Sequence, residues 1–350
     1  MDANPPERLS GFETVQALEE ALSRPTPAVV DAMRQVDGDV MVLGAGGKMG
    51  PTLAVMARRA ATDHGQSHKR VIAVSRFSAP KAAEGLAHAG IEAIKCDLMD
   101  EDGLRGLPDV PNIVYMVGTK FGSTGQEART WAMNTFLAGR VAARFRRSRF
   151  VVFSSGNVYP FAPVLHGGST ERTAPGPVGE YAQSVLGRER VFEHFAALHH
   201  TPCVFFRLNY AVEMRYGVLL DIARKVWVGE PIDLRTGHIN CLWQGDANAY
   251  ALRSFLLAEA PPRVLNVTGP EILSVRSLAL EFGELMDRRP VFVNTEQPDA
   301  LLSNALQAHK LLGYPSVSVG QAIEWVAAWV IDGGPILGKP TKFEVRDGRF

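Results

Sequence analysis

Short apolar runs alternate with amphipathic stretches along most of the chain from residue 39 onward. The runs are rich in valine and isoleucine, as is typical of strands that are buried on both faces of a sheet. Repeated strand–helix units of this length predict a parallel sheet with helices on both faces. The runs that we predict as strands are 40–43, 71–75, 91–97, 113–117, 150–154, 204–208 and 264–268.

Apolar residues at helical spacing predict the helices between these strands. Two short helices are expected in the first 37 residues, the first on apolar positions such as Phe12 and Leu22 and the second over 28–36. The other predicted helices are 79–89, 127–147, one that begins at Tyr181, and 218–228, 246–257, 275–286, 300–312 and 319–331.

Composition narrows the class of protein. The 350 residues carry 37 Lys plus Arg and 37 Asp plus Glu, so the formal net charge is zero. This balance argues against nucleic acid or an anionic membrane as a partner. No apolar run reaches the roughly 18 residues of a spanning helix, and the first residues lack a signal-peptide pattern. Cys96, Cys203 and Cys241 lie far apart, so we expect core thiols in a cytoplasmic protein and no metal site.

The turn at 44–50 carries the first chemical signal. Gly44, Gly47 and Gly50 follow the first predicted strand, and Pro51 opens a helix. Glycines between a strand and a helix N-terminus let a pyrophosphate approach backbone N–H groups that point at it. A glycine turn alone is also compatible with an ordinary tight turn.

Further motifs follow in a fixed order. They are the Cys96-Asp97-Leu98 step, the segment 153–159 (FSSGNVY), the segment 181–185 (YAQSV), and the later segments 207–209, 243–247 and 264–269. Together with the glycine turn, they resemble the extended short-chain dehydrogenases/reductases, the group that includes NAD-dependent sugar-nucleotide epimerases and dehydratases. The resemblance covers roughly residues 38–290.

The resemblance implies an α/β fold with a Rossmann-type doubly wound parallel sheet. It divides the chain into an N-terminal helical appendage at 1–37, a dinucleotide-binding domain at 38–209 to which 239–268 return, and a smaller C-terminal substrate lobe. The lobe comprises 210–238 and 269–350, including a polar tail after residue 332 that we expect to fold back over the site. A homodimer through the helices at 127–147 and from 181 is also implied.

By the same resemblance, a nicotinamide dinucleotide binds along the carboxyl edge of the sheet. The implied contacts are Gly44, Gly47, Lys48, Met49, Gly50, Ser75, Arg76, Asp97, Leu98, Val117 and Gly118. Asp97 would lie near the adenine, although it also suits an N-cap of a helix at 99–104. Ser75 and Arg76 end the second strand without a carboxylate, which favours the 2′-phosphate of NADP over NAD. Arg76 as a solvated loop residue is the alternative.

The implied catalytic pair is Ser155, which polarises a substrate oxygen, and Tyr181, which transfers the proton. Ser154 competes with Ser155 for this assignment. The family pattern has a lysine four residues after the tyrosine, where this chain has Val185. A cation is therefore expected from elsewhere, with Lys120 as first candidate and Arg188 as second, although Arg188 also suits the surface of its helix.

Asn157, Asn209 and Arg215 are assigned to the substrate. Arg207, Arg235 and Asp246 stand at landmarks that border the substrate in relatives, but each equally suits a structural contact. Asn134 matches the family's helix asparagine in a supporting role, and no histidines show the spacing of a metal site.

Two functions fit this pattern. The first is an NAD(P)-dependent oxidoreductase or epimerase/dehydratase acting on a hydroxyl or carbonyl carbon of a small, sugar-like substrate. The second is a non-catalytic sensor or scaffold that binds the dinucleotide, and Val185 is the observation that favours it. Ser155 and Tyr181, both retained, favour the enzyme.

Overall fold

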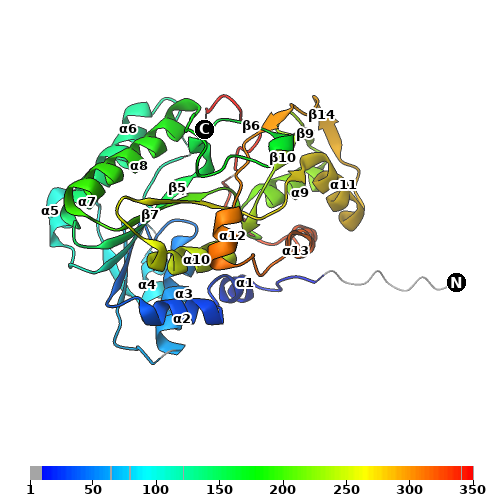
Figure 1. Ribbon diagram of the computed structural model, residues 1–350. Coiled ribbons are helices and arrows are strands. Elements are labelled where there is room, and N and C mark those ends of the chain that lie inside the picture. Colours follow the sequence, from blue (N-terminus) through cyan, green and yellow to red (C-terminus); the bar gives the residue numbers. More distant parts are fainter. Residues whose placement is uncertain (1–9, 64, 79, 121, 340, 350) are drawn as a thin grey trace.

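Seven parallel strands form one sheet through the middle of this computed structural model (Figure 1), in the order β12-β7-β5-β4-β1-β2-β3. The structure describes residues 10–63, 65–78, 80–120, 122–339 and 341–349. The sheet strands are β1 (Val40–Leu43), β2 (Val71–Ser75), β3 (Glu92–Lys95), β4 (Asn112–Tyr115), β5 (Arg149–Ser155), β7 (Cys203–Leu208) and β12 (Arg263–Val267). This confirms the predicted doubly wound fold, with its switch point between β1 and β4.

Side chains along each strand alternate between two apolar layers, because successive residues of a strand point to opposite faces. On one face, Val42 packs with α2 (Pro27–Gln35), α3 (Gly50–Asp63) and α10 (Gln244–Arg253). On the other, Met41 packs with α5 (Glu101–Gly106), α7 (Leu137–Arg144) and α8 (Gly179–His199). Both faces are therefore covered, which explains why the strands read as continuous apolar runs.

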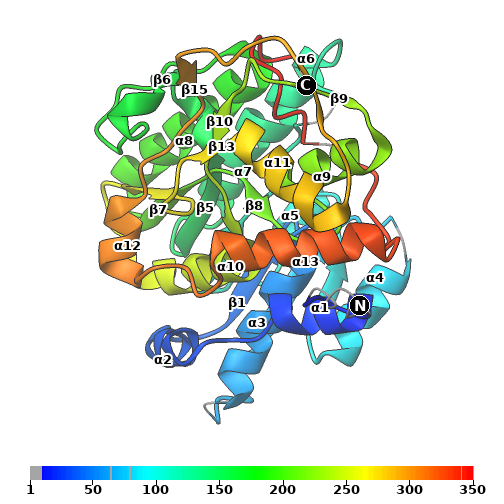
Figure 2. The same cartoon turned by 90° about the vertical axis from the view of Figure 1, so that its right-hand side faces the viewer.

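A second apolar core lies beside the sheet, at the right of Figure 1. It is built by α1 (Val15–Leu22), α9 (Val218–Val228), α11 (Val275–Met286) and α13 (Val319–Ile331), and Figure 2 shows α13 running across the front of the molecule above α1. The two N-terminal helices are therefore divided between cores. Leu18 and Leu22 of α1 join this lobe, whereas Val29 and Met33 of α2 pack under the sheet.

Short elements complete the chain. They are α4 (Pro80–His88), α6 (Glu127–Trp131), α12 (Leu306–Leu312) and the strand pairs β6 (Ala162–Pro163) with β15 (Asp299–Ala300), β8 (Ala211–Val212) with β11 (Leu242–Trp243), β9 (Pro231–Asp233) with β14 (Val291–Val293), and β10 (His238–Ile239) with β13 (Leu273–Ser274). In the described part of the chain, no helix combines the length and apolar character that crossing a membrane requires.

Several predicted boundaries need correction. The helix predicted over 300–312 is only α12, because residues 299–300 pair with β6 as β15. The one predicted over 127–147 ends at Arg144 and contains a π-helical segment, Ala132–Phe136, between α6 and α7. Residues 1–9 of the predicted appendage and residue 79 of the predicted helix 79–89 lie outside the described residues. The homodimer through these helices stays a prediction.

Arg207 lies in β7 as part of a buried ion pair. Its Nε and Nη2 donate to the two carboxylate oxygens of Glu189 on α8, at 2.9 and 2.6 Å. Its Nη1 donates to the hydroxyl of Tyr159 at 2.7 Å, and Ser154 Oγ donates to the same Glu189 carboxylate. The side chains of Arg207 and Glu189 are 5% and 1% exposed. Arg207 was expected either to border the substrate or to make a structural contact, and the buried pair with Glu189 is a structural contact.

We predict that Glu189→Ala lowers the free energy of unfolding by about 3–5 kcal/mol, since it leaves the Arg207 guanidinium buried without its counter-charge. Glu193→Ala on the same helix is the matched control. Its exposed pair with Arg190 should contribute less than about 1 kcal/mol. Urea unfolding followed by circular dichroism measures both variants, and equal losses would contradict the structural role.

Candidate active site

The glycine turn joins β1 to α3 at the carboxyl edge of the sheet. Gly44 has φ +90°, and a Cβ there would lie 3.0 Å from the backbone of Met116 and Val117 after β4. A Cβ at Gly50 would lie 2.4 Å from the carbonyl oxygen of Ala45. Neither position tolerates a side chain, so the turn is held close against its neighbours with the N-terminus of α3 open toward a cleft.

This cleft has a volume of about 840 Å³ and lies between the sheet edge and the lobe. The residues assigned from sequence that line it are Gly44, Gly47, Lys48, Met49, Gly118, Lys120, Ser155, Asn157, Tyr181, Asn209 and Arg215. Those assigned that do not line it are Gly50, Ser75, Arg76, Asp97, Leu98 and Val117. The structure thus gathers the glycine turn and the catalytic candidates around a single cavity.

The residues expected at the adenosine end lie outside the cleft. Arg76 is exposed, and the Ser75 hydroxyl would be 2.5 Å from a Cβ at Gly46, so it packs beneath the turn. Asp97 Oδ1 accepts a hydrogen bond from the Met99 amide at 3.0 Å. The N-cap predicted at Asp97 is wrong, because α5 begins at Glu101 and Asp100 caps it by accepting from the Gly103 amide.

Ser155 and Tyr181 lie together in the cleft. A side-chain hydrogen bond joins them, and Ser155 Oγ also accepts from the amide and the Nδ2 of Asn157, at 3.1 and 3.0 Å. Ser154 also borders the cleft, but its hydroxyl donates to Glu189. The geometry therefore favours Ser155 over Ser154 as the partner of Tyr181.

Val185, in place of the family lysine, is 1% exposed and packs in a small apolar cluster with Val158 and Tyr159. Tyr181 is partly buried against the same cluster. The position four residues after the tyrosine therefore faces apolar side chains, and no charge reaches the cleft from it.

Arg188, seven residues after Tyr181, is a buried cation rather than a surface residue, with 5% exposure. Its Nη1 donates to the Phe153 carbonyl at 2.7 Å, and its Nε and Nη2 donate to the carbonyl and side-chain oxygens of Asn134, at 3.2 and 3.1 Å. Asn134 lies in the π-helical segment, where the regular i→i−4 ladder is interrupted. Its side chain also bonds the amide and the carbonyl of Thr119, which supports the role predicted for it.

Burial dominates the electrostatics of Tyr181. It raises the pKa of the phenol, while the positive charge of Arg188 and the hydrogen bond to Ser155 act in the opposite direction. Efficient proton transfer near neutral pH requires a phenol pKa well below the usual value of about 10. In the protein alone the pKa of Tyr181 stays above this value, because the effect of burial is larger than that of the Arg188 charge.

Two lysines converge on the cleft from different loops. Lys120 Nζ lies 5.7 Å from the centroid of the Tyr181 ring, and Lys48 Nζ lies 3.1 Å above the Tyr216 ring. Burial lowers the pKa of Lys120 to about 8. Burial, followed by the charges of Lys339 and Lys120, lowers that of Lys48 to about 7.

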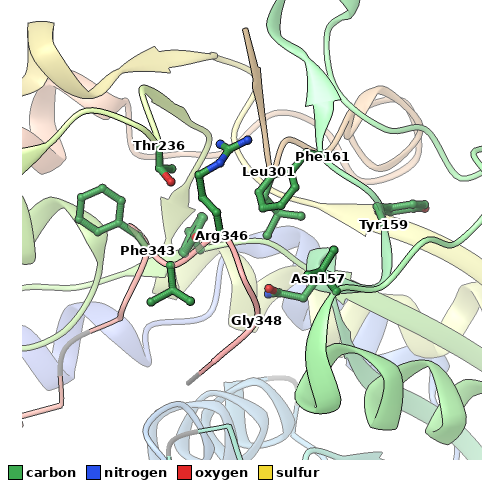
Figure 3. Close-up of a pocket in the computed structure, with 11 residues that line it drawn as sticks. Asn157, Tyr159, Phe161, Thr236, Leu301, Phe343, Arg346 and Gly348 are labelled. Atoms are coloured by element: carbon green, nitrogen blue, oxygen red, sulfur yellow. The ribbon is translucent and has the colours of Figure 1, made fainter. Parts of the chain in front are cut away.

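The C-terminal tail folds back over the site, as expected. Leu337, Lys339 and Thr341 line the cleft. Further along, Phe343 is 4% exposed in the lobe core. In Figure 3, Phe343, Arg346 and Gly348 pass between Thr236 and Asn157, and Arg346 lies 4.2 Å from the Phe161 ring.

Sequence reasoning missed several residues of the cleft. They are Gly46, Tyr210, Tyr216, Lys339 and Thr341. Gly46 lies within the glycine turn, and Tyr210 directly follows Asn209. Both could therefore have been predicted from their neighbours in the sequence. Tyr216, Lys339 and Thr341 carry no local motif.

Other candidates have structural contacts. Asp246 accepts from the amides of Ser316 and Val317, and Arg235 pairs with Asp233 at 2.6 Å. Within the described ranges, no cluster of His, Cys, Asp or Glu is suited to a metal ion, and the three cysteines are free and buried.

Comparison with known proteins defines the class. Solved structures of UDP-sugar epimerases share the fold of this chain. Residues 40–213, just under half of the chain, match the model of the NAD dependent epimerase/dehydratase family. The matched segment contains the glycine turn, Ser155, Tyr181 and Arg188. No curated protein sequence matches the chain.

Solved structures share the fold at low identity. MoeE5 in complex with UDP-glucose and NAD is 21% identical with a TM-score of 0.66, over 85% of this chain and 99% of that chain. UDP-glucuronic acid 4-epimerase from Bacillus cereus, in complex with NAD, is 16% identical with a TM-score of 0.68, over 84% and 99%. UDP-glucose 4-epimerase from Thermotoga maritima, with UDP-glucose, is 17% identical with a TM-score of 0.66, over 84% and 99%.

We predict that binding of inorganic pyrophosphate at pH 8 is accompanied by proton uptake. Lys48, with a pKa of about 7, is mostly neutral at that pH, and a bound anion raises the pKa by favouring the charged form. Calorimetry in two buffers of different ionisation enthalpy measures the uptake. Lys48→Met should reduce it and Lys310→Met, on the surface of α12, should not. A binding enthalpy independent of the buffer would contradict this prediction.

Proposed function

We propose that this protein is an NAD(P)-dependent oxidoreductase or epimerase/dehydratase that acts on a hydroxyl or carbonyl carbon of a small, sugar-like substrate. The observation that carries the proposal is the hydrogen-bonded pair Ser155–Tyr181 in the same cleft as the glycine turn. One cavity thus joins a proton-transfer group to a site suited to a dinucleotide.

The residues of the turn fit a dinucleotide pyrophosphate. Gly47 of the turn and Thr52 at the start of α3 line the cleft. A glycine turn before a helix N-terminus lets a pyrophosphate approach backbone N–H groups. A bound nicotinamide supplies the exchange of a hydride at its ring. Gly118, Thr119 and Lys120, beside the sheet edge, would border that end of the cofactor.

In the proposed mechanism, Ser155 holds the reacting oxygen by a hydrogen bond and polarises it. Tyr181 takes the proton from an alcohol, or returns it to a carbonyl oxygen, at its phenolic oxygen. Arg188 acts as a positioning residue whose fixed charge stabilises the tyrosinate that this transfer requires. Lys120, whose Nζ lies 5.7 Å from the centroid of the Tyr181 ring, is the second cation.

The two cations divide what one lysine does in the family. Arg188 supplies charge from beneath the site but is engaged by Phe153 and Asn134. Lys120 lies in the cleft, where a ligand can contact it. This division supports the catalytic function over the alternative of a sensor or scaffold, to which Val185 alone had pointed.

Structural neighbours bind UDP-sugars and NAD, as their names state, which supports a nucleotide sugar as the first substrate class to test. NADP over NAD remains our expectation from Ser75 and Arg76, where no carboxylate is available for the ribose 2′-hydroxyl. An exposed Arg76 is open to a 2′-phosphate.

The test is to denature freshly purified protein and identify the released nucleotide by mass spectrometry. Near-stoichiometric oxidised nicotinamide dinucleotide is the result for an epimerase or dehydratase that retains its cofactor through each turnover. An empty protein that binds NADPH over NADH indicates an exchanging reductase and Arg76 as reader of the 2′-phosphate. Failure to carry or bind either cofactor would refute the proposed function.

Tyr181→Phe then separates enzyme from sensor. With UDP-glucose and UDP-glucuronic acid as first substrates, the variant should lose turnover by about 10²–10⁴-fold while retaining the cofactor. Tyr314→Phe, at a side chain 68% exposed, is the matched control and should retain activity. A Tyr181→Phe protein with unchanged turnover would remove Tyr181 from the mechanism.

A further inference from the structure

The turn that follows β5 places two N–H groups of Asn157 on one oxygen of Ser155. Ser155 is the N-cap of a short 3-10 helix, Gly156–Val158, and its Oγ accepts from the Asn157 amide at 3.1 Å. The Nδ2 of the same asparagine donates to the same oxygen at 3.0 Å. Asn157 is half-buried and borders both the cleft and the smaller pocket of Figure 3.

The backbone of this turn is fixed by its neighbours. A Cβ at Gly156 would lie 3.0 Å from the side chain of Asn209 and 3.0 Å from Ser303 Oγ, so the turn packs closely against these two residues. On the other side of Asn157, Val158 is fully buried. The asparagine is therefore held in the position from which its side chain reaches the serine, and little freedom is lost when that contact forms.

The hydrogen bonds of Ser155 determine what its hydroxyl group can do. A serine hydroxyl has one O–H to donate and two lone pairs that accept, and the two N–H groups of Asn157 occupy both lone pairs. In the hydrogen bond between Ser155 and Tyr181, the serine therefore donates and the phenolic oxygen accepts. This direction favours the ionised phenol, so the bond acts against burial on the pKa of Tyr181.

A serine held in this way can only donate to a substrate oxygen. If one lone pair of Ser155 were open, it would accept the hydroxyl proton of a bound alcohol and compete with Tyr181 for that proton. With both lone pairs occupied, the alcohol directs its proton to Tyr181 while Ser155 donates to the alcohol oxygen. The side chain of Asn157 is needed for this, because the backbone amide alone would leave one lone pair open.

We propose that Asn157 is a positioning residue that acts through Ser155, since its side-chain amide occupies the second lone pair of the serine and holds the serine as a hydrogen-bond donor toward Tyr181 and the substrate oxygen. This role differs from the direct substrate contact that the sequence led us to expect. The inference rests on the proposed function for the reaction that Ser155 serves, whereas the hydrogen-bond arrangement itself can be tested in the free protein.

A double-mutant cycle on the pKa of Tyr181 tests the arrangement without turnover. The full-length chain is labelled with fluorotyrosine and titrated by fluorine NMR, and the resonance that is lost in Tyr181→Phe reports this residue. Ser155→Ala removes the donor and should raise the pKa by about one unit. Asn157→Ala should raise it by about half a unit when Ser155 is present and by less than about 0.2 units in Ser155→Ala. The charges of Arg188 and Lys120 are the same in all these proteins.

Asn157→Asp is the second variant, because it keeps the shape of the side chain and replaces the donor with an acceptor. The carboxylate accepts the proton of Ser155, so the pKa of Tyr181 should rise further than in Asn157→Ala. The rise should be smaller in the Ser155→Ala background, where only the added charge acts. Asn304→Ala is the matched control, since this half-buried asparagine donates to the Gly167 carbonyl instead of to a residue of the cleft. It should leave the pKa unchanged.

Turnover of UDP-glucose separates positioning from substrate binding. Asn157→Ala should lower kcat by about tenfold, change KM by less than about twofold and have no further effect in the Ser155→Ala background. An increase in KM that persists in Ser155→Ala would assign Asn157 to substrate binding and refute the proposal.

Two results of the titration would also overturn the proposal. One is an unchanged pKa of Tyr181 in folded Asn157→Ala. The other is an equal rise with and without the Ser155 hydroxyl, which would mean that the asparagine does not act through the serine. If the chain shows neither turnover nor dinucleotide binding, the proposed function fails, while the titration of the free protein still decides the role of Asn157.

Discussion

The guanidinium of Arg188 connects the segments that carry Ser155, Tyr181 and Lys120. It bonds the Phe153 carbonyl near the end of β5 and the carbonyl and amide oxygens of Asn134 in the π-helical segment. Asn134 in turn holds Thr119 after β4. A Cβ at Gly118 would lie 2.6 Å from Arg188 Nη2, so that loop packs directly on the arginine. One buried cation thus fixes the loop of Lys120, the strand of Ser155 and the helix of Tyr181.

Much of this arrangement could be predicted from sequence because its signals are local. The glycine turn, Ser155 and Tyr181 each stand at the end of a strand or the start of a helix, and parallel strands bring such ends to one edge. The bounds of β1, β2, α9, α11 and α13 agree with the prediction to the residue, because continuous apolar runs mark strands buried on both faces and helical apolar spacing marks helices with one buried face. Predictions failed where contacts between distant segments determine the local structure. At β15, for example, pairing with β6 replaces the start of the helix predicted over 300–312.

Spacing named Arg188 only as the second candidate cation, and its burial beneath the site could not be predicted from the sequence. Helical periodicity places Arg188 on the face of α8 that bears Tyr181, yet its burial depends on a carbonyl of β5 and on the π-helical segment around Asn134, neither of which leaves a clear mark in the sequence. The position of the C-terminal tail could not be predicted from the sequence either. Lys339 and Thr341 reach the cleft only because Asp221 of α9 and the lobe core around Phe343 hold the chain there.

The most direct test of the central claim is the pKa of Tyr181 in Arg188→Met, read by ultraviolet tyrosinate titration with Tyr181→Phe subtracted. Loss of the charge should raise this pKa by about one unit or more, whereas Arg190→Met, one exposed arginine of the same helix, should leave it unchanged. Arg188→Lys keeps the charge and should stay near the wild-type value even if Arg188→Met folds poorly. An unchanged pKa in folded Arg188→Met, or a pKa in Arg188→Lys raised as far as the loss of charge predicts, would contradict the claim that Arg188 supplies the charge missing at Val185.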